Sequence, residues 1–144
     1  MDVFNSKSAP GTPVLAYQCT RNENQLWQTS LAPPPFDNPP QANAGWISSM
    51  ALFWIKTLDN LCLDTELGNV TPALGSRVVV NPCDATRETQ QWTYDPMLGT
   101  LFHMYTGFCA DAPGASINAD VGLIPLRLWK CGDQKDSQVW SMPA

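Results

Sequence analysis

Gln25-Leu26-Trp27, Gln90-Gln91-Trp92 and Gln138-Val139-Trp140 are three copies of one short motif, Gln-x-Trp, within a chain of 144 residues. Each copy begins 6 or 7 residues after a cysteine. These cysteines are Cys19, Cys83 and Cys131. A motif that returns in register with cysteine indicates one supersecondary unit used three times. The sequence therefore predicts a fold built from three similar repeats.

The repeat also has a recognisable beginning, the pattern Cys-x-Asp. Cys62-Leu63-Asp64 and Cys109-Ala110-Asp111 carry it in full, and Met1-Asp2 looks like its remnant. From this Asp to the second cysteine the distance is 17, 19 or 20 residues. A short apolar run precedes each second cysteine, and such runs bounded by Gly, Pro and Asn predict β-strands. The three runs are Val14–Tyr17, Val78–Val80 and Leu126–Trp129.

The composition favours one small all-β domain. At 144 residues the chain is long enough for a single hydrophobic core, and its 13 Pro and 9 Gly interrupt it too often for long helices. The net charge of −5, with only 8 scattered Lys and Arg, argues against a nucleic-acid partner. No apolar run approaches the length that inserts into a membrane, and residues 1–4 do not resemble the start of a signal peptide.

Four of the five cysteines fall at equivalent places in two repeats. Cys62 and Cys83 are 21 residues apart, and Cys109 and Cys131 are 22 residues apart. This register predicts one disulfide in each of these repeats, and therefore an oxidising compartment. The alternative is metal ligation, but the chain has no Cys-x-x-Cys and a single histidine, His103, so neither a metal nor a cofactor is expected.

The fifth cysteine, Cys19, has no partner in this register. Its expected partner falls just before residue 1, so either the chain is cut from a longer protein or Cys19 is a free thiol. Asn69-Val70-Thr71 is an N-glycosylation sequon, which agrees with a secreted glycoprotein.

With its Cys-x-Asp beginnings and Gln-x-Trp ends, the chain resembles the ricin B-chain type β-trefoil lectins from Asp2 to Trp140. The resemblance implies an all-β, pseudo-threefold barrel capped by hairpins. It also implies that the motif tryptophans pack in the core where the repeats meet. Each repeat of such a fold can carry a shallow sugar site.

In this family the site uses the Asp of Cys-x-Asp, an aromatic residue two positions before the second cysteine, an Asn before Gln-x-Trp, and sometimes the Gln itself. The ring stacks on the C–H face of a pyranose, while the carboxylate and the amide bond its hydroxyls. The candidate sugar-binding residues are Asp2, Tyr17, Asn24 and Gln25 in the first repeat, and Asp111, Trp129, Ser137 and Gln138 in the third.

The second repeat departs from this set. It keeps Asp64 and Gln90, but Asn81 stands at the aromatic position and Thr89 at the Asn position. Without an aromatic ring for stacking, this repeat is expected not to bind sugar.

The expected organisation is a single trefoil domain over residues 1–144. Its repeats are expected at about 1–58, 59–106 and 107–144. A Pro-rich insertion at about 32–43 is either a surface excursion or, with Phe36 and Trp46 as anchors, a contact arm or ligand-site wall. The strand before the first Cys-x-Asp and the last strand of the third repeat are missing, which suggests a module excised from a larger protein.

These observations favour a non-catalytic carbohydrate-binding module, secreted or in the lumen of the secretory pathway. Its expected partners are glycans of the galactose, N-acetylgalactosamine or xylose type, and a catalytic domain in the same parent chain. Catalysis is not expected, because the Asp residues of different repeats lie far apart on a threefold body and His103 is more typical of a packed side chain. The alternative is a trefoil without sugar binding that serves as a protein-interaction or structural domain.

Overall fold

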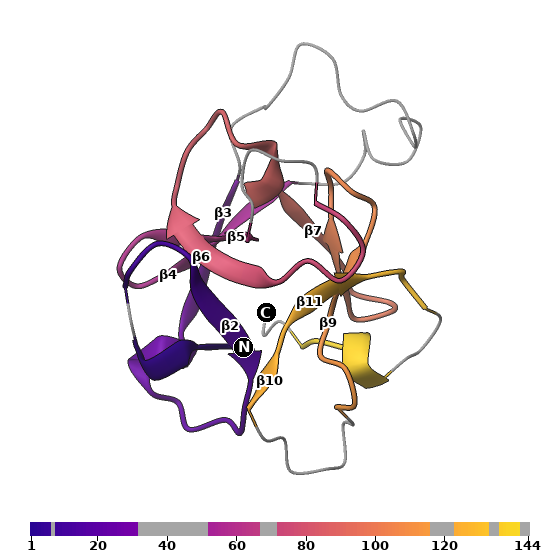
Figure 1. The fold of residues 1–144 in the computed structure, drawn as a ribbon, viewed down its shortest axis with the longest axis horizontal. Coiled ribbons are helices and arrows are strands. Elements are labelled where there is room, and N and C mark those ends of the chain that lie inside the picture. Colours follow the sequence, from indigo (N-terminus) through magenta and orange to yellow (C-terminus); the bar gives the residue numbers. More distant parts are fainter. Residues whose placement is uncertain (7, 32–51, 67–71, 116–122, 133–135, 142–144) are drawn as a thin grey trace.

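The computed structural model describes residues 1–6, 8–31, 52–66, 72–115, 123–132 and 136–141. In these ranges the chain forms short β-strands and 3-10 turns, and no helix among them is long and apolar enough to cross a membrane (Figure 1). The strands are β1 (Asp2–Val3), β2 (Thr12–Ala16), β3 (Trp27–Leu31), β4 (Phe53–Thr57), β5 (Leu61–Thr65), β6 (Val78–Pro82), β7 (Trp92–Asp95), β8 (Thr100–His103), β9 (Cys109–Asp111), β10 (Ile124–Pro125) and β11 (Arg127–Trp129). The 3-10 turns are Phe4–Ser6, Glu23–Gln25, Glu88–Gln90 and Asp136–Gln138. The predicted insertion at 32–43, with Phe36 and Trp46, and the sequon at 69–71 lie outside the described residues.

Each repeat contains an antiparallel strand pair with the same register. Asp2 lies opposite Leu15, Asp64 opposite Val79, and Asp111 opposite Arg127. In all three pairs the Asp faces the residue four positions before the second cysteine. Asp2 therefore holds the same strand position in its repeat as Asp64 and Asp111 hold in theirs.

The hydrophobic core gathers equivalent residues of the three repeats. Val14, Val78 and Leu126, each five positions before the second cysteine, are all fully buried. Their backbones are joined, because the N–H of Val78 donates to the carbonyl of Leu126 and the N–H of Leu126 donates to that of Val14. Strands β2, β6 and β11 accordingly surround the centre of the ribbon (Figure 1). One core thus holds three repeats around an approximate threefold axis.

Two β-hairpins connect the repeats. Strands β3 and β4 pair over their whole length, with Trp27 opposite Thr57, and β7 pairs with β8, with Trp92 opposite His103. Strand β4 also meets β7 where Phe53 faces Trp92. Both hairpins follow a Gln-x-Trp motif, so the motif marks the place where one repeat passes to the next.

The tryptophans of the motif make the same hydrogen bond in each repeat. The indole Nε1–H of Trp27, Trp92 and Trp140 donates to the carbonyl of the middle residue of Cys-x-Asp, over 3.0, 3.0 and 3.1 Å. Trp92 is fully buried, as the core prediction requires. Trp27 and Trp140 are only partly buried against the core, because they border an open cavity between the first and third repeats.

Both predicted disulfides are present. Cys62 bonds to Cys83 and Cys109 bonds to Cys131, with Cα–Cα distances of 5.0 and 5.1 Å. Each bond closes a repeat from its Cys-x-Asp beginning to its second cysteine. Cys19 forms no disulfide with the other cysteines described, and its side chain is exposed; this arrangement agrees with both alternatives that the sequence leaves open.

His103 is a buried side chain of the second hairpin. Its Nε2 lies 2.8 Å from the carbonyl oxygen of Thr89, and its Nδ1 lies 2.8 Å from Oγ1 of Thr106. Because a carbonyl can only accept, Nε2 carries the proton and Nδ1 accepts from the threonine hydroxyl. Burial lowers the pKa of His103 from 6.5 to about 4. The imidazole is therefore neutral in the folded protein and packs 4.6 Å from the Trp92 ring.

We expect this histidine to make the fold sensitive to acid. Between pH 6.5 and about 4 the unfolded chain binds a proton at His103 that the folded chain does not. The contribution to stability is complete above pH 6.5 and falls as the pH decreases, by about 3 kcal/mol in total for a shift of this size. Chemical unfolding of the wild type and of His103→Gln at several pH values measures it. If both proteins lose stability equally between pH 6.5 and 4.5, the buried imidazole is not responsible.

Candidate functional site

The glutamine of each motif clamps the loop around the second cysteine. Nε2 of Gln25, Gln90 and Gln138 donates to the carbonyl of the residue before that cysteine, over 2.7, 2.8 and 2.9 Å. Oε1 accepts from the N–H of the residue after it, over 2.7, 2.9 and 2.9 Å. This clamp fixes the 3-10 turn of the motif beside the Asp of the same repeat. All three candidate sites therefore have the same hydrogen-bonded loop beside their Asp.

In the first repeat, two amide groups orient the carboxylate of Asp2. Asn24 Nδ2 donates to Oδ1 over 2.7 Å, and Gln25 Nε2 donates to Oδ2 over 2.8 Å. Asn24 also donates to the carbonyl of Val3 over 3.3 Å. The sequence-predicted residues Asp2, Asn24 and Gln25 are thus brought into direct contact. A carboxylate has about four acceptor positions, so these two bonds leave capacity for a further donor.

Tyr17 is the residue that directly follows β2 in the first repeat. Asp2 is opposite Leu15 on β2, and Tyr17 follows Leu15 by two residues. The Tyr17 side chain is 41% exposed. The first repeat therefore presents an oriented carboxylate together with an open aromatic ring.

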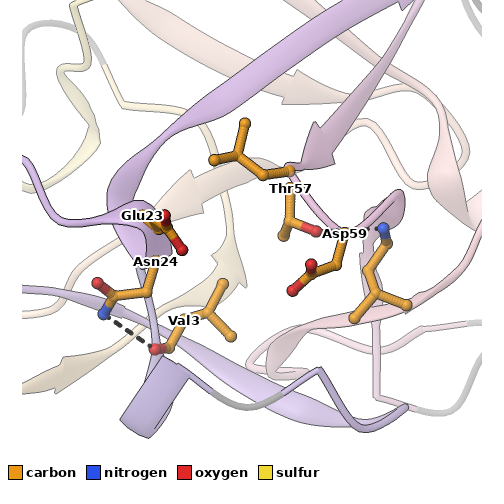
Figure 2. A pocket seen from close by; sticks show the side chains of 7 residues that line it. Val3, Glu23, Asn24, Thr57 and Asp59 are labelled. Carbon is orange, nitrogen blue, oxygen red and sulfur yellow. Dashed lines mark hydrogen bonds between the residues drawn. The ribbon is translucent and has the colours of Figure 1, made fainter.

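A small hollow of about 70 Å³ adjoins this site (Figure 2). It is lined by Val3, Glu23 and Asn24 and, where β4 turns into β5, by Thr57, Leu58, Asp59 and Leu61. Figure 2 places the carboxylates of Glu23 and Asp59 on opposite sides of the hollow. The surroundings of the first site are therefore negatively charged.

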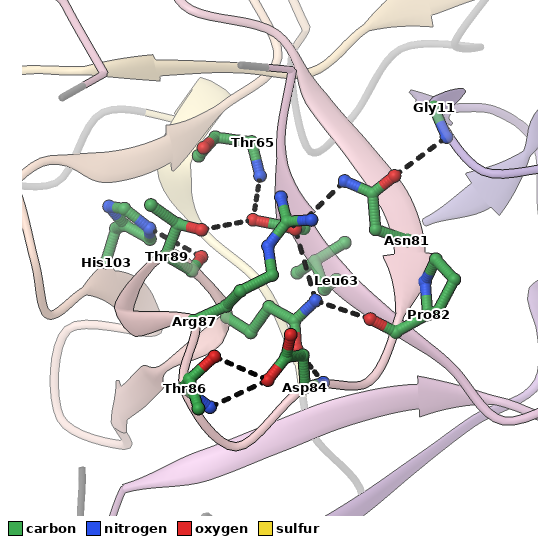
Figure 3. Close-up of polar contacts among 12 residues, drawn as sticks. Gly11, Leu63, Thr65, Asn81, Pro82, Asp84, Thr86, Arg87, Thr89 and His103 are labelled. Atoms are coloured by element: carbon green, nitrogen blue, oxygen red, sulfur yellow. Dashed lines mark hydrogen bonds and ion pairs between the residues drawn. The ribbon is translucent and has the colours of Figure 1, made fainter. Parts of the chain in front are cut away.

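In the second repeat the carboxylate of Asp64 is closed off (Figure 3). Asp64 is fully buried and forms an ion pair of 2.6 Å with Nη2 of Arg87. Its oxygens also accept hydrogen bonds of 2.6 to 3.1 Å from the backbone N–H of Thr65 and from the side chains of Asn81, Thr89 and Gln90. These donors fill its acceptor positions. The residues that replace the aromatic and the Asn thus turn the site into a structural polar network.

In the third repeat, an arginine occupies the centre of the predicted site. Nε of Arg127 donates to Oδ2 of Asp111 over 2.7 Å, and its guanidinium lies 3.9 Å from the centroid of the Trp129 ring. Asp111 is 2% exposed, whereas Trp129 is partly exposed. The cation covers one face of the ring and therefore takes up part of the surface on which a sugar would stack. Arg127 thus contacts both Asp111 and Trp129 and links these two predicted residues.

The two polar candidates of the third repeat differ from their counterparts in the first. Gln138 is fully buried, and its amide serves the clamp described above. The carbonyl of Ser137 accepts from the N–H of Ala112 over 2.8 Å, and its side chain is half-buried. Gln138 is therefore placed to support the loop, while Ser137 lies beside β9 near Asp111.

Sequence reasoning missed the two arginines. Arg127 stands two residues before Trp129 on one strand, and the alternation of side chains along a strand places both on one face. The sequence alone could therefore have predicted that Arg127 lies beside Trp129. Arg87 lies in a loop three residues before Gln90, and no pattern in the sequence indicates its contact with Asp64. Among the described residues, no group of three or more His, Cys, Asp and Glu could hold a metal ion.

Comparisons with known proteins agree with this geometry. Residues 1–140 match the family described as ricin-type beta-trefoil lectin domain. The chain is similar in structure to ThreeFoil, a designed 3-fold symmetric protein, with a TM-score of 0.69 and 18% sequence identity over 95% of this chain and 84% of that one. The comparison with curated proteins gave no match. The β-trefoil prediction is thereby confirmed.

Proposed function

This chain belongs to the ricin-type β-trefoil lectin family, and we propose that it binds neutral glycans chiefly through Asp2 and Tyr17 of the first repeat. The family is one of carbohydrate-binding domains without catalytic activity of their own. The observation that carries the assignment to this repeat is the pairing of an oriented carboxylate with an exposed ring. Galactose, N-acetylgalactosamine and xylose remain the sugar types that we propose.

The geometry supports a defined role for each residue of the first site. The Tyr17 ring, 41% exposed, offers a flat apolar surface to the C–H face of a pyranose. The Asp2 carboxylate accepts from sugar hydroxyls in charge-assisted bonds. Asn24 and Gln25 hold that carboxylate in place, so little conformational freedom is lost when the sugar binds.

The third repeat is proposed as a weaker, second site. Asp111 is less exposed than Asp2, at 2% against 7% of each residue, and Arg127 already pairs with its carboxylate. A sugar could stack on Trp129 and hydrogen-bond to the guanidinium or to Ser137. Binding there therefore depends more on Trp129 and Arg127 than on Asp111.

The charge of the first site favours neutral over acidic glycans. The chain has a net charge of −5, and Glu23 and Asp59 face the hollow beside Asn24. A sialylated or sulfated sugar would bring a further negative charge into this region, which is unfavourable at short range. The same carboxylates can accept hydrogen bonds from the hydroxyls of a second neutral sugar unit.

Two disulfides and the lectin family fit an extracellular location. We propose that the domain is secreted or lumenal and that it tethers a catalytic domain in the same parent chain to glycan-bearing surfaces. In this role the lectin supplies attachment and the partner supplies chemistry.

A glycan array with the purified wild type and with Tyr17→Ala tests the proposal. We expect wild-type binding to neutral galactose-type or xylose-type glycans, weaker signals from their sialylated forms, and a strong loss in Tyr17→Ala. Leu98→Ala is the matched control, because Leu98 is 44% exposed but lies in the β7–β8 turn. Absence of wild-type binding to every glycan would contradict the proposal and favour a protein-interaction domain.

A further inference from the structure

Two arginines lie opposite each other where the second repeat meets the third. Each repeat faces the next through one such pair, formed by the residue six positions before its second cysteine and the residue four positions before the second cysteine of the next repeat. The three pairs are Pro13 with Val79, Arg77 with Arg127, and Pro125 with Leu15. Two of them join a proline to a buried aliphatic side chain. The remaining pair places two positive charges at positions that are uncharged in the other repeats.

The two arginine side chains share one face of the backbone pairing. The N–H groups of Val78 and Leu128 donate the hydrogen bonds that flank Arg77 and Arg127, over 3.0 and 2.8 Å. Side chains directly opposite each other between such bonds stand on the same face, with their Cβ atoms about 5 Å apart. Like charges in this arrangement repel each other. Arg77 is exposed and the Arg127 side chain is 32% exposed, so both cations are open to a ligand.

The acidic neighbours of this pair leave guanidinium donors available. Asp111 accepts from Nε of Arg127 over 2.7 Å, and the N–H donors of the two Nη atoms lie outside that bond. Glu66 follows β5 beside Arg77, and its backbone N–H donates to the carbonyl of Arg77 over 3.0 Å. Among the described residues, no ion pair joins the side chains of Glu66 and Arg77. One ion pair with Asp111 therefore accompanies two cations.

An aromatic side chain adjoins the two cations. The guanidinium of Arg127 lies 3.9 Å from the centroid of the Trp129 ring, and Trp129 is half-buried. A turn of the second repeat packs on the same ring, because a Cβ atom at Gly75 would lie 3.8 Å from its Cζ3 atom. The N–H of Gly75 also donates to the carbonyl of Leu128 over 2.8 Å. Two repeats thus combine positive charge with apolar surface, which suits a ligand that has both an anionic group and a C–H face.

We propose that this face binds an acidic pyranose, a sugar whose ring carries a carboxylate or a sulfate, in preference to a neutral one. The proposal rests on the lectin function proposed above and gives the third repeat a selectivity opposite to that of the first. The oxyanion accepts charge-assisted hydrogen bonds from Arg77 and from the Nη atoms of Arg127, and it offsets their mutual repulsion. The C–H face of the ring packs on the exposed part of Trp129. Asp111 positions Arg127 by holding its Nε.

Nuclear magnetic resonance titration at low salt tests this selectivity through the indole Nε1–H of Trp129 and the Nε–H of Arg127. The probes are methyl galactoside, methyl galacturonide and galactose 6-sulfate. We expect at least one acidic probe to bind at these two groups at least about tenfold more tightly than methyl galactoside, because two guanidinium groups bond the added anion. The tighter acidic probe identifies the anion. Equal or weaker binding of both acidic probes would overturn the proposal.

Sodium acetate is a further probe, since it carries a carboxylate but no sugar ring. We expect it to bind these two groups more weakly than methyl galacturonide, because it has no C–H face to pack on Trp129. Acetate that binds as tightly as both acidic sugars would overturn the proposal and leave a simple anion site.

A variant at the exposed member of the pair locates the selectivity. Arg77→Gln should bind the acidic and neutral probes equally, with an unchanged thermal midpoint. Arg21→Gln is the matched control, because Arg21 is an exposed arginine of the first repeat and its loss changes the net charge by the same amount. It should keep the wild-type preference. An unchanged preference in Arg77→Gln would overturn the proposal.

The same titrations separate this inference from the proposed function. The side-chain amides of Asn24 and Gln25 report binding of methyl galactoside to the first repeat. If they respond while Trp129 shows no preference for either acidic sugar, this inference alone is overturned. If they do not respond while Trp129 prefers an acidic sugar, the inference is supported and the assignment of neutral-glycan binding to the first repeat fails.

Discussion

Trp92→Ala is expected to lower the free energy of unfolding by about 3–5 kcal/mol, the usual cost of deleting a large buried aromatic side chain. The Trp92 side chain is fully buried, packs against the His103 ring at 4.6 Å, and donates to the carbonyl of Leu63. Its removal leaves a cavity and an unpaired buried carbonyl. Denaturant unfolding measured by fluorescence or circular dichroism checks the value.

The chain provides its own controls for this substitution. Trp27 and Trp140 make the same hydrogen bond as Trp92, but they are only partly buried beside an open cavity. Trp27→Ala and Trp140→Ala should therefore cost clearly less than Trp92→Ala. Equal losses for all three variants would contradict the assignment of Trp27 and Trp140 to the border of an open cavity.

The double change Tyr17→Ala with Trp129→Ala should abolish retention on a matrix that displays many neutral glycans. Both aromatic rings at the candidate sites are then lost, and with them the stacking surface for the sugar. If both sites bind, the wild type should also prefer a dense glycan surface to the same free sugar, because a second contact within one molecule adds avidity. Retention volumes and inhibition by free sugar measure both effects.

The single variants distinguish the two sites. Tyr17→Ala should lose more retention than Trp129→Ala, because Arg127 already covers one face of the Trp129 ring. Asn81→Ala is not a neutral control, since Asn81 is buried and bonds both Asp64 and the N–H of Gly11. Leu98→Ala serves as the neutral control instead. Full retention by the double variant would move the binding surface away from both sites.

The repeat architecture could be predicted from the sequence because the Gln-x-Trp motif recurs three times, each time 6 or 7 residues after a cysteine. The interval of 21 residues from Cys62 to Cys83 is nearly matched by the 22 residues from Cys109 to Cys131, so both disulfides could be predicted from the alignment alone. The closure of the second site was also predictable, since Asn81 replaces the aromatic residue. Its amide bonds the Asp64 carboxylate that a sugar would otherwise use.

The detailed geometry of the candidate sites depends on side-chain contacts that the spacing of the sequence motifs does not encode. Whether Arg127 reaches Asp111 is decided by strand register, which aligns them as opposite residues of β9 and β11. The sequence also treats Gln25 and Gln138 as equivalent. Yet Gln25 bonds its Asp, whereas Gln138 is fully buried with its amide bonded to the loop. Motif spacing also gives no sign that Trp92 is fully buried while Trp27 and Trp140 border an open cavity.

Nuclear magnetic resonance titration of the ¹⁵N-labelled domain tests the central claim most directly, because it reports each site separately. The probes are methyl β-galactoside, N-acetylgalactosamine and xylose. We predict that at least one of them shifts the side-chain amide resonances of Asn24 and Gln25 and the backbone amide of Tyr17. The side-chain amides of Asn81 and Gln90 should stay in place, because their partner Asp64 is closed to solvent. Shifts at Asn81 and Gln90 without shifts at Asn24 would contradict the account.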